Sequence, residues 1–192
     1  AMSPDGRLTL AGFGGEVGKG TGAYVSKDRG DSWEAIEGVA LDQFESYGMG
    51  INNEGDIIGI VGKSDDIERN YFVSTDGGKT FASSEVTRMA QYLAHSQDMK
   101  HQFVTRVPDP LAEEILGQIA VSHDYGRTFH NIHVNYTSFY MWTSIACSYE
   151  GEYVFATTFD THGNGFVHRS HDYGETWTEI PRQEDVELNP TY

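Results

Sequence analysis

The sequence has few cysteines, few basic residues and no long apolar run. Cys147 is the single cysteine, which excludes an internal disulfide and a cysteine-based zinc site. Only 13 Lys and Arg oppose 29 Asp and Glu, so the formal charge is −16. Nucleic acids and anionic membranes attract basic side chains and repel this composition. No apolar run approaches the roughly 20 residues of a membrane-spanning helix. We therefore expect no nucleic-acid partner and no membrane insertion.

Glycine and aromatic residues, by contrast, are plentiful. The chain has 22 glycines against 5 prolines, and aromatic residues make up 12% of it. Tyr, Phe and Thr favour strands, and glycine permits the tight turns that join them. A hydrophobic content of 38% is enough for a packed core. The composition therefore predicts a folded protein rich in β-structure.

One eight-residue pattern, Ser-x-Asp-x-Gly-x-Ser/Thr-Trp/Phe, occurs four times along the chain. The segments, called the motif turns below, are residues 26–33, 74–81, 122–129 and 170–177. Their aspartates follow one another at intervals of 48 residues, and four such intervals equal the length of 192. This constant spacing predicts a single region, 1–192, built from four repeats. The repeats are approximately 1–48, 49–96, 97–144 and 145–192.

Each position of the motif has a physical role in a tight turn. The aspartate can accept backbone N–H bonds, the glycine supplies a positive φ, and the Ser or Thr hydroxyl can bond back across the loop. The final Trp or Phe starts the next strand and buries its ring between layers. We therefore predict structural roles for Ser26, Asp28, Gly30, Ser32, Trp33, Ser74, Asp76, Gly78, Thr80, Phe81, Ser122, Asp124, Gly126, Thr128, Phe129, Ser170, Asp172, Gly174, Thr176 and Trp177.

Each repeat also contains an earlier hairpin. Strand-like runs precede the motif turns at 23–25, 71–73, 119–121 and 165–168. The turns Asp5-Gly6, Glu54-Gly55 and Glu150-Gly151 predict a further hairpin upstream, whereas the third repeat has Met99 after Asp98 and lacks the glycine. Two hairpins give four strands, which is the content of one propeller blade.

With these residues, the sequence resembles the Asp-box family, also called bacterial-neuraminidase repeats. This family occurs in sialidases and related glycosidases, in sortilin-type receptors and in a photosystem II assembly factor. The resemblance implies an all-β fold: a β-propeller of four-stranded antiparallel blades with an Asp box in each third-to-fourth strand turn. It does not fix a function, because these repeats occur in proteins of unrelated function.

The ends of the chain fall at the same phase of the repeat. Only Ala1, Met2 and Ser3 precede the first turn, and residues 189–192 would lead into the missing strand. We therefore expect the chain to be an excerpt of a longer repeat array. A closed four-bladed ring and two chains that complete an eight-bladed ring are the alternatives.

Ligand candidates lie on the rim opposite the motif turns, where the longer and more varied loops are expected. They are Asp65, Arg69, Asp109, Asp160 and His162. Residues 109–117 have the Asp cap, early Pro and final Gly of a short helix. Together with Tyr136, Phe139, Tyr140, Met141 and Trp142 they give the third blade extra apolar surface, which core packing explains in part and for which a protein contact is the alternative.

No catalytic set is recognisable. The sialidases of the family use three arginines to hold a sugar carboxylate, but Arg69, Arg88, Arg106 and Arg182 have no spacing that supports such a triad. The glycine-rich stretch 12–22 departs from a phosphate loop in spacing and is followed by no helix. The eight histidines have no spacing that demands a metal, and we expect Cys147 to be a buried apolar residue. We therefore assign no catalytic, cofactor-binding or metal-binding residues and no cofactor.

The sequence favours a non-catalytic β-propeller scaffold or protein-interaction module within a larger protein or assembly. Its partners would be proteins or further blades of the same propeller, and a glycan is possible as a ligand. The alternative is a sialidase-like or other glycoside hydrolase, or a glycan-binding domain. A rim groove with paired carboxylates or clustered arginines beside an aromatic residue would separate the two.

Overall fold

The computed structural model describes residues 1–3, 5–13, 22–36, 45–63, 69–107, 118–132, 134, 140–160 and 162–181. The first two sheets contain β1 (Thr9–Phe13), β2 (Gly22–Ser26) and β3 (Glu34–Ala35), and then β4 (Glu45–Ile51), β5 (Ile58–Lys63), β6 (Asn70–Ser74) and β7 (Ala82–Ser83). The last two contain β8 (Ala90–His95), β9 (Gln102–Arg106), β10 (Ile119–Ser122) and β11 (His130–Ile132), and then β12 (Tyr140–Cys147), β13 (Val154–Asp160), β14 (Gly165–Ser170) and β15 (Thr178–Ile180).

All four sheets are antiparallel meanders in which strands pair in the order of the sequence. Three sheets have four strands, and the first has three plus a single bridge between Met2 and Thr9. The described residues include one 3₁₀ turn, Glu85–Thr87, and no α-helix, so none of them forms a helix that could cross a membrane. The runs expected to precede the motif turns lie in β2, β6, β10 and β14.

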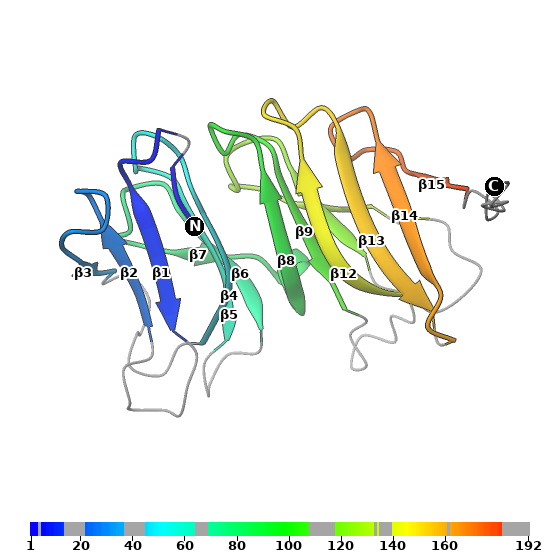
Figure 1. Ribbon diagram of the computed structural model, residues 1–192, viewed down its shortest axis with the longest axis horizontal. Coiled ribbons are helices and arrows are strands. Elements are labelled where there is room, and N and C mark those ends of the chain that lie inside the picture. Colours follow the sequence, from blue (N-terminus) through cyan, green and yellow to red (C-terminus); the bar gives the residue numbers. More distant parts are fainter. Residues whose placement is uncertain are drawn as a thin grey trace, which may run out of the picture.

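The sheets pack face to face in the manner of propeller blades. Strand β1 contacts β4, β4 contacts β8, and β8 contacts β12, so that the sheets stand around a shared side (Figure 1). The predicted fold class, an all-β propeller of four-stranded antiparallel blades, is confirmed.

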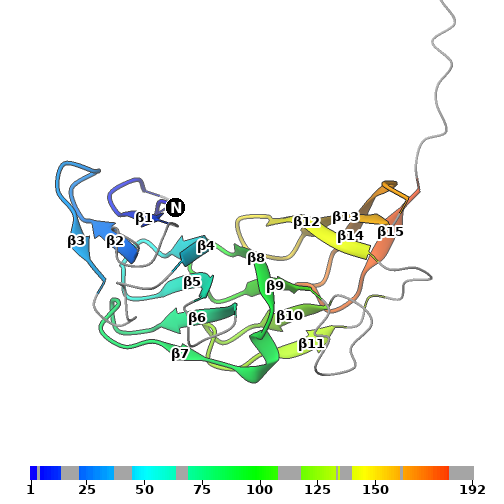
Figure 2. The same ribbon diagram turned by 90° about the horizontal axis from the view of Figure 1, so that it is seen from below.

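The four blades form an open arc. Figure 2 shows the first blade, β1–β3, and the fourth blade, β12–β15, at opposite ends of the molecule. The closed four-bladed ring that the sequence analysis left open is therefore not formed by the strands that the structure describes.

The core consists of three apolar layers, one between each pair of neighbouring blades. Leu10 and Ile60 belong to the layer between blades 1 and 2, Val104 to the layer between blades 2 and 3, and Phe103 and Trp142 to the layer between blades 3 and 4. Three layers between four sheets cover the two middle blades on both faces and the end blades on one.

The third repeat forms its first hairpin without the expected glycine. Met99 adopts a φ of 59°, close to the 77° of Gly55 in the equivalent turn of blade 2. Its side chain is fully buried between blades 2 and 3, and the Gln102 amide donates a hydrogen bond of 2.7 Å to its carbonyl oxygen. Packing against the neighbouring blade therefore holds a backbone conformation that L-residues otherwise avoid.

Candidate functional site

The four motif turns have one hydrogen-bond scheme. The serine hydroxyl donates to the aspartate Oδ1 at 2.7–2.9 Å and accepts from the glycine N–H at 2.7–3.0 Å. The Ser or Thr four residues after the aspartate donates its N–H to Oδ1 and its hydroxyl to Oδ2, at 2.6–2.9 Å. Each turn is thus a closed polar network that fixes the rim of its blade.

These hydrogen bonds change the acidity of the aspartates. Donation by Ser32 to Asp28 and by Thr80 to Asp76 is the main cause that lowers the pKa of each carboxyl to about 2. Both oxygens of these carboxylates are occupied by donors from the same turn, so the motif aspartates serve structure and are not free to bind a ligand.

Motif turns and first-hairpin turns lie side by side on one rim. In every blade, a backbone N–H of the motif turn donates to a carbonyl oxygen of the first hairpin, at 2.9–3.2 Å. In blade 2, for example, the Gly77 N–H bonds to Asp56, and in blade 4 the Tyr173 N–H bonds to Glu152. We call this edge of the molecule the motif rim.

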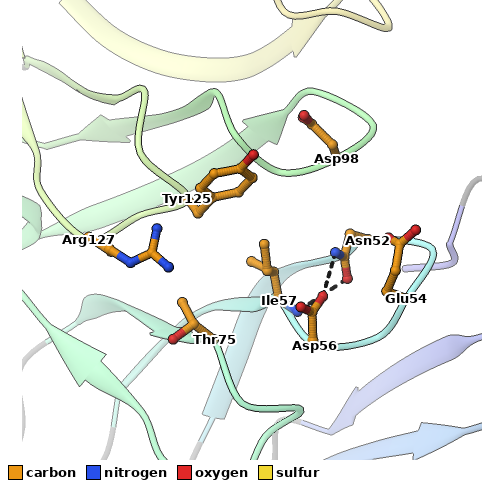
Figure 3. Close-up of a pocket in the computed structure, with 8 residues that line it drawn as sticks. All are labelled: Asn52, Glu54, Asp56, Ile57, Thr75, Asp98, Tyr125 and Arg127. Carbon is orange, nitrogen blue, oxygen red and sulfur yellow. Dashed lines mark hydrogen bonds between the residues drawn. The ribbon is translucent and has the colours of Figure 1, made fainter.

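A polar hollow of about 320 Å³ opens on the motif rim between blades 2 and 3. The residues that line it come from two turns of each blade and are shown in Figure 3: Asn52, Glu54, Asp56, Ile57, Thr75, Asp98, Tyr125 and Arg127. Three carboxylates and one guanidinium face the same space, beside one aromatic ring. The hollow therefore has the charge to attract a cationic group.

The carboxylates of the hollow are held by their own turns. The Asn52 amide donates to Asp56 Oδ1 at 2.7 Å (Figure 3). Burial acts to raise the pKa of Asp98, but hydrogen bonds from the Ser96 hydroxyl and the Lys100 N–H outweigh it and lower the pKa. Asp98 is thus an ionised carboxylate at neutral pH and a poor proton donor.

Two histidines and a glutamate meet on the motif rim between blades 3 and 4. His123 Nε2 lies 2.7 Å and His130 Nε2 lies 3.0 Å from Glu175 Oε1, and one ligand atom of each residue lies within 4.8 Å of the others. Burial acts to raise the pKa of Glu175, but the hydrogen bonds from the two imidazoles outweigh it and lower the pKa. Within the described residues, these three side chains form the group whose nitrogen and oxygen atoms could bind a metal ion.

Sequence reasoning missed this group because it treated the histidines separately from Glu175. His123 and Glu175 are the second and sixth residues of consecutive motif turns, and His130 follows the third turn directly. An alignment of neighbouring repeats, position by position, could have found this group of residues. A search for local spacings within one repeat could not.

Of the five ligand candidates predicted on the opposite rim, the structure describes Arg69, Asp160 and His162. Asp65 and Asp109 lie outside the described residues, as do the predicted helix 109–117 and Arg182. The Arg69 guanidinium stacks on Tyr47, 4.1 Å from the ring centre. Asp160 accepts hydrogen bonds from the backbone of His162 and from Asn164, so it closes its own loop.

Two further residues that the sequence offered as functional candidates, Arg106 and Cys147, lie in surroundings that suit a structural role. Arg106 is buried and donates hydrogen bonds to the Arg88 carbonyl and to the side chains of Gln118 and Asn131, so it spans blade 3 and does not open to a ligand. Cys147 is half-buried, and burial raises the pKa of its thiol to about 11, which makes it a weak nucleophile.

The outer face of blade 4 is apolar and exposed. Met141, Phe155, Phe159 and Val167 on this face are between 39% and 48% exposed. Pairing of β12, β13 and β14 puts these side chains on one side of the sheet, away from blade 3.

The comparisons with known proteins place the chain among β-propellers. No protein-family model matches the chain, and no curated protein matches it. Among solved structures, it is similar to a GH74 xyloglucanase from Xanthomonas campestris, with 16% identity over 94% of the chain and a TM-score of 0.63. It is also similar to a prolyl endopeptidase, with 13% identity over 92% of the chain and a TM-score of 0.59. YCF48 from Cyanidioschyzon merolae has 15% identity over 84% of the chain and a TM-score of 0.54.

These similarities concern the fold. The chain spans 29% of the xyloglucanase, 30% of the prolyl endopeptidase and 51% of the YCF48 chain. Proteins with such different names share the architecture, so the architecture supports a propeller module and no particular activity. Membership of the Asp-box family remains a prediction.

Proposed function

We propose that the chain is a non-catalytic β-propeller module that binds protein through the outer face of blade 4. The observation that carries this proposal is the exposure of Val167. Val167 lies three residues before its motif serine, and the residues at this position in the other blades, Ala23, Tyr71 and Ile119, are 0–1% exposed. Val167 is 39% exposed.

A second position also differs in exposure between blade 4 and an inner blade. Phe103 in blade 3 is fully buried in the layer against blade 4, while its equivalent in blade 4, Phe155, is 44% exposed. The face of blade 4 therefore has the composition of a blade-to-blade contact, and none of the described strands packs against it. Apolar faces of this kind mark interaction sites.

The occupant that fits this face best is another propeller-type sheet. The three covered junctions are built from a blade face packed on the next blade, with aliphatic and aromatic residues on both sides. A further blade, in the same protein or in another chain, would bury Phe155 and Val167 as Phe103 and Ile119 are buried. The polar hollow between blades 2 and 3 would remain open to a cationic group of a partner.

A hydrolase function is less well supported. A glycosidase needs one carboxyl whose pKa is raised so that it can donate a proton. Hydrogen bonds from Asn164 lower the pKa of Asp160, and the pKa of Asp98 is also lowered. Neither residue has the protonation that a general acid requires.

Sedimentation of the chain at several concentrations tests the proposal. We expect concentration-dependent association, because the exposed face can be covered by a second copy, and we expect both Phe155→Lys and Val167→Lys to abolish it. Tyr149→Lys is the matched control, since Tyr149 is 63% exposed but lies in the β12–β13 turn. Association that survives both lysine variants would contradict the proposal, and a monomer at all concentrations would exclude a second copy of the chain as the occupant.

A further inference from the structure

We propose that the motif rim holds a divalent metal site of the zinc class at the junction of blades 3 and 4, with His123, His130 and Glu175 as ligands. Two imidazoles and one carboxylate are a known three-ligand set for Zn²⁺, which leaves a fourth position for water. The site does not depend on the proposed contact at the outer face of blade 4.

The distances need only small changes to hold the ion. Zn²⁺ binds imidazole nitrogen and carboxylate oxygen at about 2.0–2.2 Å, so tetrahedral ligand atoms lie roughly 3.4 Å apart. Glu175 Oε1 is 2.7 Å from His123 Nε2 and 3.0 Å from His130 Nε2, and no pair of the three ligand atoms is more than 4.8 Å apart. The side chains are 32%, 49% and 43% exposed, so rotation about their own bonds can open two separations and close the third.

His101 provides the support that a metal-binding histidine requires. Its Nδ1 lies 2.8 Å from Nδ1 of His123, and its ring lies against Tyr173 with the ring centres 4.6 Å apart. When Nε2 of His123 binds a cation, the proton of that ring must lie on Nδ1, from which it donates to His101. The present contact fits this arrangement with one change of tautomer in each ring. His101 is therefore a positioning residue.

The repeats supply an internal comparison. Positions related to His123, His130 and Glu175 by 48 residues are Thr75, Ala82 and Arg127, which offer no imidazole or carboxylate. The corresponding residues at the first junction are Lys27, Glu34 and Lys79, of which Lys27 and Glu34 form an ion pair of 2.7 Å. The three junctions between neighbouring blades thus have equivalent positions, and the two imidazoles and one carboxylate occur at the junction of blades 3 and 4.

The donors select the class of cation. Nitrogen ligands suit Zn²⁺ and its neighbours Ni²⁺ and Cu²⁺, whereas Mg²⁺ and Ca²⁺ prefer all-oxygen sites. Because His123 and His130 belong to blade 3 and Glu175 to blade 4, the bound ion would link the two blades and stabilise the folded chain by mass action.

Titration of the metal-free full chain with ZnCl₂ tests the site. At pH 7.5, we expect one saturable binding event with one ion per chain and a rise in melting temperature, while MgCl₂ has no effect. His130→Ala and Glu175→Gln should each weaken binding at least tenfold, and His101→Phe should weaken it by about 10–100-fold as a supporting residue. Co²⁺ bound in place of Zn²⁺ should give the visible absorption of a four-coordinate ion.

His171→Ala is the matched control, because His171 occupies the same place in the fourth motif turn as His123 in the third, and its described ring contact is with Tyr153 alone. Circular dichroism of each metal-free variant establishes that it folds. No saturable binding by the unmodified chain, or equal binding after His130→Ala and Glu175→Gln, would overturn the proposal. Variants that lower the metal-free melting temperature but keep the zinc-dependent rise would also overturn it, since they would show a purely structural hydrogen-bond cluster.

Discussion

At the scale of single residues, each motif turn depends on a serine and an aspartate that satisfy one another and the backbone. Ser74 is buried, and its hydroxyl donates to Asp76 while accepting from the N–H of Gly78. Asp76 in turn accepts from the backbone and hydroxyl of Thr80. These local bonds explain why the turn can be read from eight residues of sequence, because every partner lies within the motif.

The lowered pKa of Asp76 predicts a dependence of stability on acid. Its carboxyl titrates near a pKa of about 2 in the folded chain and near about 4 in the unfolded chain. Between these values the unfolded state binds more protons, so the contribution of Asp76 is complete above about pH 4 and is lost as the pH falls towards about 2.

We therefore expect Asp76→Asn to unfold at lower urea concentration than the unmodified chain at pH 6, and the difference to shrink as the pH approaches about 2. Urea unfolding followed by tryptophan fluorescence measures it. Glu179→Gln serves as the control, because Glu179 lies in β15 outside the motif turns. A difference that stays constant or grows on acidification would contradict the assigned role.

At the scale of elements, the glycines of the motif turns differ in what surrounds them. Gly30 and Gly126 both have positive φ, of 100° and 78°. A Cβ on Gly126 would lie 2.6 Å from Gln102 Oε1 and 2.9 Å from Val73 Cγ2, whereas a Cβ on Gly30 would meet nothing closer than 3.9 Å. The third motif turn is thus packed against blade 2, and the first is open.

Gly30→Ala should cost about 1–2 kcal/mol in the free energy of unfolding, from the left-handed backbone alone. Gly126→Ala should cost about 1–3 kcal/mol more, because the methyl group also forces apart a packed junction. Chemical denaturation of the two variants gives the comparison. Equal losses would show that packing between blades does not constrain the third turn.

The distinction between turns that depend on their own residues and turns that pack against another blade explains how much could be predicted from the sequence. Turns with the eight-residue motif, or with Asp-Gly or Glu-Gly, follow from local rules, and β2, β6, β10 and β14 lie at the runs predicted to precede the motif turns. The turn at Met99 gave no such signal, since the neighbouring blade holds its φ of 59°. The group of His123, His130 and Glu175 was hidden for a related reason: it forms only when two motif turns of different blades are brought together.

At the scale of the whole molecule, the open arc makes the blades unequal. Blades 2 and 3 are packed on both faces, and every residue of β6 and β10 is buried. In β14 of blade 4, exposed residues alternate with buried or half-buried ones, and β2 of blade 1 is buried in part. In a linear array, stability is the sum of the repeats and of the contacts between neighbours, so a blade with one neighbour opens at lower cost than a blade with two.

Hydrogen exchange followed by mass spectrometry should show this order. Amides of β6 and β10 should exchange most slowly, and those of β2 and β14 should exchange faster, although all four strands occupy the same place in their blades. Equal rates in the four strands would mean that the array unfolds as one unit and that the exposed face of blade 4 does not lower the stability of that blade.

When a partner covers the exposed face of blade 4, β14 gains a second neighbour, and its exchange should slow towards that of β10 while β2 stays unchanged. The change in exchange rate at β14 but not at β2 therefore locates the partner on blade 4, whatever the identity of that partner.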